Sequence, residues 1–198
     1  MDLGLRDKVA VVTGGTEGIG FAAARQFLAE GAYVAVCGRR QAVLDQALAQ
    51  LGPRAFGQTC DMTQEDAVYA FAKAVYDHFG RLDVWVNNVG ATIARHDDWY
   101  TGEEIDRTYA VNFKSVVMGS QAAIAYLEKQ GGVIVNVASL AARCATSGRA
   151  TLYGPLKSAV VGFTNTFAGE VAAKGVRVTA VLPGFTVTPL VKATIRPE

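Results

Sequence analysis

The chain has 198 residues, of which 51% are hydrophobic and 19% charged, so it can bury a substantial core and is not expected to be disordered. Its 19 basic and 18 acidic residues give a net charge of +1, without a run of like charge that would indicate a nucleic-acid or membrane surface. We therefore expect one domain over residues 1–198, with a small molecule as its partner.

Short runs of β-branched residues alternate along the chain with longer segments of helical period. The first run is apolar throughout, as expected for a strand that helices cover on both faces. This alternation predicts an α/β fold of Rossmann type, a doubly wound parallel sheet in a three-layer α/β/α arrangement. The predicted strands are Val9–Thr13, Tyr33–Cys37, Ala55–Cys60, Val84–Asn88, Val133–Ala138 and Val176–Leu182, and the predicted helices are Gly18–Glu30, Gln41–Leu51, Gln64–Phe79, Glu103–Lys129 and Tyr153–Lys174.

A glycine-rich turn follows the first predicted strand and leads into the first predicted helix. Its spacing is TGxxxGxG, which differs from the plain GxGxxG fingerprint. The pyrophosphate of a dinucleotide needs free backbone N–H groups at a helix N-terminus, without side chains at the closest approach. Glycines also cluster in ordinary strand-to-helix turns, but the position between strand and helix favours a dinucleotide site. The residues expected to form it are Gly14, Thr16, Gly18, Ile19 and Gly20.

The end of the second predicted strand indicates which dinucleotide binds. An acidic residue there would bind the ribose 2′-hydroxyl of NAD, whereas this chain has Arg39 and Arg40. Two guanidinium groups suit the doubly charged 2′-phosphate of NADP, so NADP(H) is favoured and NAD(H) is the alternative. Two observations weaken this assignment: Glu17 could place a carboxylate near the same phosphate, and the arginines could belong to a solvated turn.

A tyrosine and a lysine, Tyr153 and Lys157, are four residues apart and so share one face of a predicted helix. A phenol exchanges a proton with an alcohol near neutrality only if its phenolate is stabilised. An ammonium about 4 Å away would lower the phenol pKa from about 10 to about 7. YxxxK alone is common on helix surfaces, but beside a nicotinamide it predicts hydride transfer between the cofactor and an alcohol or ketone. Tyr153 would be the general acid or base, Ser139 would hold the substrate oxygen, and Lys157 would also bind the nicotinamide ribose.

Taken together, these motifs resemble those of the short-chain dehydrogenases/reductases over nearly the whole chain. The stretch Asn87 to Gly90 is similar to the NNAG segment of that family, with Val89 in place of its alanine. The resemblance implies an adenine-binding role for Asp61 and a water-linked proton relay through Asn112 to the lysine. The implied catalytic group is Asn112, Ser139, Tyr153 and Lys157, and the further implied cofactor contacts are Asp61, Met62, Asn88, Gly90, Pro183, Gly184 and Thr188.

Three features bear on how closely the chain follows the family. Pro155 would break a helix interior, so we predict that the last helix begins close to Leu152 and holds the proline in its first turn. Asn112 could instead be a core polar group that satisfies a kink in a long helix. The chain ends at Glu198, whereas relatives continue through a helical lid and a last strand, so either the domain is naturally short or this sequence lacks that part.

The residues expected near the substrate do not select one carbonyl compound. They are Thr92, Ala141, Arg143 and Phe185, with Trp99 and Tyr100 at the entrance. Two other function classes stay open: a dinucleotide-binding sensor or scaffold without turnover, and an epimerase or dehydratase, although the latter class carries TGxxGxxG spacing. A panel of ketones with NADPH would separate them.

Compartment, metal content and assembly are also predicted. Residues 1–8 lack the apolar stretch of a signal peptide, and no CxxC or Cys/His spacing indicates disulfides or zinc, so a cytoplasmic protein is expected. His96, Asp97 and Asp98 are adjacent and cannot easily converge on one ion, so no metal is expected. By resemblance, the two long helices would pair subunits in a homodimer or homotetramer.

Overall fold

The computed structural model describes residues 1–144, 150–189 and 191 of the chain, which contain a six-stranded parallel sheet. Its strand order is β3-β2-β1-β4-β5-β6, so the direction of winding reverses between β1 and β4. This is the predicted doubly wound sheet of Rossmann type, and ligands of such sheets bind at the reversal, beyond the carboxyl ends of the strands. The strands are β1 (Val9–Thr13), β2 (Tyr33–Gly38), β3 (Ala55–Thr59), β4 (Val84–Asn87), β5 (Gly132–Val137) and β6 (Val176–Val181).

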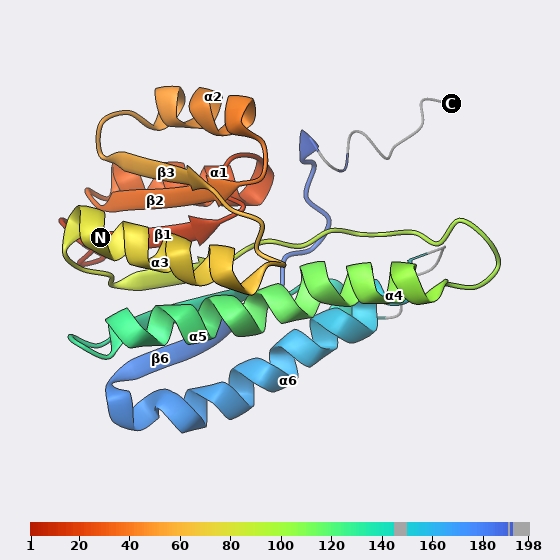
Figure 1. The fold of residues 1–198 in the computed structure, drawn as a ribbon. Coiled ribbons are helices and arrows are strands. Elements are labelled where there is room, and N and C mark those ends of the chain that lie inside the picture. The colour runs from red at the N-terminus through yellow and green to blue at the C-terminus, as the bar shows by residue number, and fades with distance from the viewer. Residues whose placement is uncertain (145–149, 190, 192–198) are drawn as a thin grey trace.

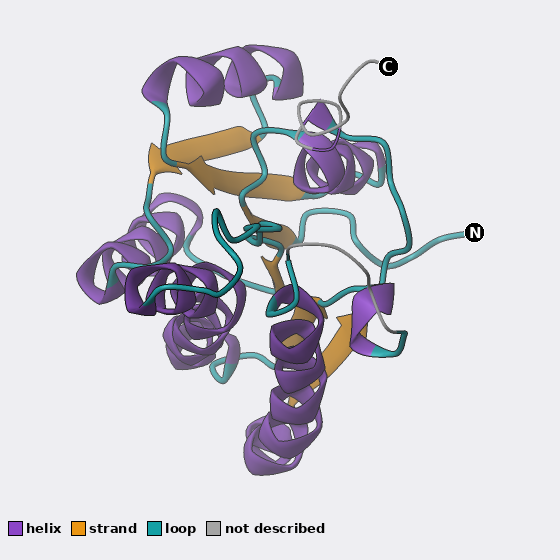
Figure 2. Cartoon of the chain, turned by 90° about the vertical axis from the view of Figure 1, so that its right-hand side faces the viewer, coloured by secondary structure: helices purple, strands orange, loops and turns teal. Residues whose placement is uncertain are grey.

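Helices cover both faces of the sheet, as Figures 1 and 2 show. Because successive strand residues face opposite sides, Val9 and Val11 pack into one core and Ala10 and Val12 into the other. The first core is closed by α3, α5 and α6, and the second by α1 and α2. The helices are α1 (Gly18–Ala29), α2 (Gln41–Leu51), α3 (Glu65–Phe79), α4 (Gly102–Tyr109), α5 (Ser115–Leu127) and α6 (Tyr153–Val171). Within the described ranges, no helix combines the length and apolar character that crossing a membrane requires.

The long helix expected over Glu103–Lys129 is interrupted. A π-helical segment, Ala110–Lys114, joins α4 to α5, and Asn112 lies at its centre with its side chain fully buried. A π-helical turn contains one residue more than an α-helical turn, and such turns recur at functional sites. Periodicity cannot reveal this change because the flanking residues keep a helical pattern.

The start of α6 agrees with the prediction from Pro155. The helix begins at Tyr153, with Leu152 as its N-cap, so the proline occupies the first turn. A backbone N–H at that position would have had no partner within the helix, and its absence is therefore tolerated. Lys157 follows one turn later on the same face as Tyr153.

A buried carboxylate joins the first strand to β4 at the edge of the sheet opposite the glycine turn. Asp83 accepts hydrogen bonds from the backbone N–H of Val9 at 2.9 Å and from Arg81 Nε at 2.8 Å, and Lys8 Nζ lies 3.4 Å away. Burial acts to raise the pKa of Asp83, but Arg81, Val9 and Lys8 together hold the pKa below its usual value of 3.8.

Asp83→Asn is expected to lower the free energy of unfolding at pH 7 by about 1–3 kcal/mol, because it removes the carboxylate from these partners. The pKa of Asp83 is lower in the folded state, so its stabilisation is present above the usual pKa and is lost as the pH falls through the folded value. Urea denaturation at pH 7 and pH 3 should therefore give a smaller difference at pH 3. Asp77→Asn, which disrupts an exposed pair with Lys73, is the control and should change stability by less than about 0.5 kcal/mol.

Candidate cofactor and active site

A cavity of about 1190 Å³ opens beyond the carboxyl ends of the strands and contains nearly every residue predicted for the site. It extends from the glycine turn after β1, past the ends of β2, β3 and β4, to the start of α6. Of the predicted catalytic and cofactor-binding residues, Asn112 alone does not line it. The predicted residues that do are Gly14, Thr16, Gly18, Ile19, Gly20, Arg39, Arg40, Asp61, Met62, Asn88, Gly90, Ser139, Tyr153, Lys157, Pro183, Gly184 and Thr188.

The glycine turn requires its glycines for two different reasons. Gly14 and Gly18 have φ values of 63° and 59°, a left-handed conformation that favours glycine. Gly20 has no such torsion, but a Cβ there would lie 2.5 Å from the carbonyl oxygen of Gly14. Asn88 holds the turn in place, since its Nδ2 donates to the carbonyls of Thr13 at 2.9 Å and Gly14 at 3.2 Å. The turn therefore has no side chain at these three positions and leads into the N-terminus of α1, which fits a pyrophosphate.

The far end of the cavity is formed by the segments after β2 and β3. Arg39 and Arg40 are exposed there, and Arg40 forms an ion pair with Glu17 of the glycine turn. The carboxylate of Asp61 accepts hydrogen bonds from the backbone N–H and the hydroxyl of Thr63, at 3.0 and 2.8 Å, which fixes its orientation. These positions suit the adenosine half of a dinucleotide.

Tyr153 and Ser139 meet at the opposite end of the cavity. Ser139 follows β5, and its Oγ accepts a hydrogen bond from the backbone N–H of Ala141 at 3.2 Å. Burial raises the pKa of Tyr153, and the Ser139 side chain partly lowers it. The phenol is therefore uncharged near neutrality and can act as a proton donor.

Lys157 does not lower the phenol pKa as the sequence argument expected. Its Nζ lies 5.8 Å from the centre of the Tyr153 ring and donates a hydrogen bond to the carbonyl of Val137 at 2.9 Å. The side chain is only 2% exposed, and burial lowers the pKa of Lys157 to about 8. Tyr153 and Lys157 are one helical turn apart as predicted, but burial, and not their mutual attraction, has the largest effect on the pKa of each group.

Asn112 lies behind the cavity wall and serves the backbone. Its Nδ2 donates to the carbonyls of Ala91 at 2.9 Å and Thr108 at 3.0 Å, and its Oδ1 accepts from the N–H of Ala91 at 3.0 Å. The structural alternative raised from the sequence is therefore observed. A Cβ on Gly90 would lie 2.9 Å from Lys157 Nζ and 3.2 Å from Asn112 Oδ1, so these two polar groups flank the same glycine.

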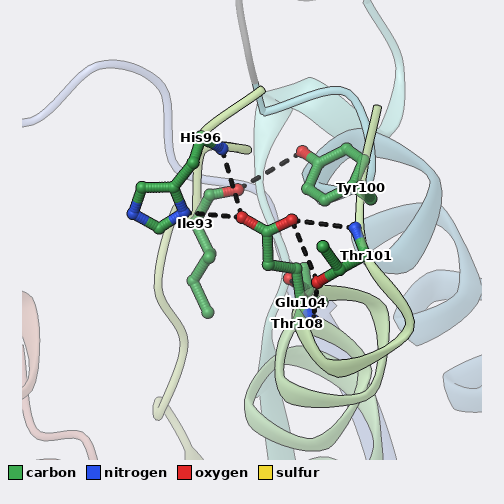
Figure 3. Close-up of polar contacts among 6 residues, drawn as sticks. All are labelled: Ile93, His96, Tyr100, Thr101, Glu104 and Thr108. Carbon is green, nitrogen blue, oxygen red and sulfur yellow. Dashed lines mark hydrogen bonds and ion pairs between the residues drawn. The ribbon is translucent and has the colours of Figure 1, made fainter. Parts of the chain in front are cut away.

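Residues 91–93 line the cavity, and the segment from there to the start of α4 is anchored by Glu104. Figure 3 shows the contacts of Glu104. Glu104 forms a capping box with Thr101 and pairs with His96 Nδ1 at 2.7 Å. Hydrogen bonds to the Glu104 carboxylate lower its pKa to about 2; the one from the Thr101 backbone has the largest effect and the one from the His96 side chain the next largest. The Tyr100 hydroxyl donates to the carbonyl of Ile93 at 3.3 Å, which ties the far side of the segment to the cavity wall.

The residues expected near the substrate are only partly brought together. Thr92, Ala141 and Phe185 line the large cavity, whereas Arg143 lines a separate cavity of about 360 Å³. Trp99 is 85% exposed and lies outside both cavities. The helical residues Arg107, Ala110 and Val111 and the strand-end residues Cys37 and Cys60 were not predicted and also line the large cavity. The position of Asn112 in the same helix was the available signal for the first three.

Comparison with known proteins identifies the family. A model of the family described as short chain dehydrogenase matches residues 8–198. The chain belongs to the short-chain dehydrogenase family. As a short-chain dehydrogenase it is an NAD(P)-dependent oxidoreductase, and its glycine turn and YxxxK segment are the motifs that resembled this family.

Individual relatives of this short-chain dehydrogenase cover nearly its whole length. An uncharacterized oxidoreductase of Staphylococcus epidermidis is 36% identical over 191 residues, or 96% of the chain and 83% of the relative. A 3alpha-hydroxysteroid dehydrogenase of Mediterraneibacter gnavus is 37% identical and matches 96% of the chain and 78% of the relative. A structure of actinorhodin polyketide ketoreductase with NADPH has a TM-score of 0.89 at 34% identity, covering 94% of this chain and 74% of that one.

Proposed function

We propose that this short-chain dehydrogenase transfers a hydride between NADP(H) and a small alcohol or ketone, with Tyr153 as the general acid or base. The observation that carries the proposal is one continuous cavity that has the glycine turn at one end and Tyr153 beside Ser139 at the other. NADPH bound with its pyrophosphate on the turn would supply the hydride. The likeness to a ketoreductase with NADPH supports the same direction of chemistry.

Each polar side chain at the reacting end has a role that its surroundings favour. The uncharged phenol of Tyr153 donates a proton to the substrate oxygen in reduction and accepts it in oxidation. The Ser139 hydroxyl holds the same oxygen, since it faces the cavity from the end of β5. Lys157 binds the nicotinamide ribose and returns the proton to Tyr153. Asn112, behind Gly90, would support that relay through water, in addition to its structural role.

The adenosine end favours NADP(H) over NAD(H). Arg39 and Arg40 both line the cavity where a ribose 2′-phosphate would lie, and no acidic residue stands at the end of β2 in their place. Guanidinium groups bind phosphate by charge-assisted, bidentate hydrogen bonds. Asp61 would accept a hydrogen bond from the adenine amino group, and Met62 would pack beside it.

A panel of ketones tests the activity. The protein is incubated with NADPH and each ketone while the absorbance at 340 nm is followed, and oxidation by at least one ketone is expected. Binding of NADPH without oxidation by any ketone would favour a dinucleotide sensor. The KM values for NADPH and NADH test the cofactor preference, and a lower KM for NADH would contradict it.

Assembly and compartment complete the proposal. Helices α4, α5 and α6 would pair subunits in a homodimer or homotetramer, which size-exclusion chromatography with light scattering would reveal. A monomer would count against this part. A small oxidoreductase that depends on a reduced nicotinamide is expected to work in the cytoplasm.

The pH dependence of reduction should follow Lys157. Its pKa of about 8 means that the ammonium is present below pH 8 and lost above it, while the phenol stays protonated. We therefore expect kcat/KM for ketone reduction to fall about tenfold per pH unit above pH 8. A profile that stays level to pH 10 would contradict this.

Loss of rate at high pH would not reflect unfolding caused by Lys157. Its folded pKa of about 8 is below its usual value of 10.5, so the unfolded chain binds more protons between these values. The contribution of Lys157 to the free energy of unfolding consequently increases with pH in that window. Circular dichroism across the same pH range is the control.

A further inference from the structure

The two arginines after β2 differ in what they contact. Arg40 forms an ion pair with Glu17, the residue directly before Gly18 in the glycine turn. Across the described ranges, Arg39 makes neither an ion pair nor a side-chain hydrogen bond, although it lines the same cavity. A ligand phosphate would therefore meet one unengaged guanidinium and one that already has a carboxylate partner.

The carboxylate of Glu17 does not cap the helix that Glu17 begins. Glu17 is the N-cap residue of α1, with extended backbone torsions of φ −150° and ψ 166°, but its side chain makes no capping hydrogen bond. It reaches Arg40 instead. The Glu17 side chain is 45% exposed and that of Arg40 67%, so a ligand can reach both.

We propose that Glu17 is a specificity-determining residue that restrains the preference of this site for NADP(H) over NAD(H). The inference rests on the proposed function, because it concerns the same cofactor cavity. A 2′-phosphate can pair with Arg40 only by displacing the Glu17 carboxylate, and the phosphate then lies near that negatively charged carboxylate. NAD(H) carries a 2′-hydroxyl at this place and has no charge to repel. The site therefore accepts both dinucleotides with less discrimination than two free arginines would give.

Glu17→Gln is the direct test, read as dissociation constants for NADPH and NADH from the fluorescence of the bound nicotinamide. NADPH is expected to bind about fivefold more tightly than in the wild type, the size of effect that an exposed ion pair exerts. The dissociation constant for NADH should stay within about twofold, which also shows that the variant is folded. Glu30→Gln is the matched control, since Glu30 ends the same helix, accepts from Gln26 Nε2 and does not line the cavity.

Removing Arg40 in two backgrounds tests whether Glu17 acts through it. Arg40→Gln should weaken NADPH binding less than about twofold in the wild type, where the guanidinium is already engaged, and about fivefold in the Glu17→Gln background. Arg39→Gln should weaken NADPH binding in both backgrounds. Equal changes for NADPH and NADH in Glu17→Gln, or the same effect of Arg40→Gln in both backgrounds, would overturn the inference while leaving the proposed function intact. A wild-type protein that binds neither dinucleotide would refute both.

Discussion

Replacing Tyr153 by phenylalanine is expected to lower kcat for ketone reduction by a factor of about 10²–10⁴, the range that a general acid contributes. The phenol is the proposed proton donor; it lines the cavity beside Ser139, and burial keeps it protonated near neutrality. The aromatic ring remains in the variant, so the dissociation constant for NADPH should change by less than about twofold. Stopped-flow measurement of NADPH oxidation and a fluorescence titration check the two statements separately.

Tyr126→Phe is the matched control for this variant. Tyr126 stacks on Tyr76 at 4.8 Å between ring centres and does not line the cavity, so its hydroxyl can be removed without altering the site. Its turnover should equal that of the wild type. If Tyr153→Phe turns over as fast as Tyr126→Phe, proton transfer does not pass through Tyr153 and the enzymatic proposal loses its acid.

Lys157→Met is expected to affect activity and stability in opposite directions. Turnover should fall at least about 10²-fold, because the variant lacks the cation proposed to bind the ribose and return the proton. Stability should increase, because burial lowers the pKa of Lys157 from 10.5 to about 8, a penalty on the charged form of about 3 kcal/mol at pH 7. The lost hydrogen bond to Val137 offsets about 1 kcal/mol of this. Thermal unfolding without cofactor should therefore give a higher Tm for the variant.

The control for Lys157→Met is the same substitution at an exposed lysine. Lys73 is paired with Asp77 on the surface of α3, and its removal should leave both turnover and Tm nearly unchanged. A clear decrease in Tm for Lys157→Met would show that the ammonium stabilises the fold, contrary to the argument from burial.

Much of the fold, and most of the residues that line the large cavity, followed from local sequence patterns. Apolar runs such as that of residues 9–12 predicted strands covered on both faces, and Pro155 set the start of α6, because both effects act within a few residues. The glycine spacing was informative for the same reason, since backbone torsion and close approach are local demands. Parallel strands then brought these segments together at one edge of the sheet.

Other features depend on contacts between distant segments, and the sequence could not supply them. The spacing of Lys157 and Tyr153 predicted that the lysine would lower the phenol pKa. This prediction was wrong, because the sequence does not show how deeply the two side chains are buried. The sequence raised Glu17 as a carboxylate that could lie near the phosphate, but its ion pair with Arg40 requires the turn after β1 to meet the turn after β2. Arg107 belongs to no sequence motif, so its place in the cavity wall was not predicted. Which face of a helix lines a cavity depends on the elements that pack around the helix.

The π-helical segment between α4 and α5 sets how far α4 is rotated about the helix axis relative to α5. Each residue of an α-helix turns the chain by about 100°, so one additional residue rotates everything before Ala110 by about that angle relative to α5. Deleting a single residue there would turn α4 about the helix axis, so that Arg107 and the segment anchored by Glu104 would face another direction. Insertions and deletions at this junction would thus change which helical side chains line the cavity, while the sheet stays intact.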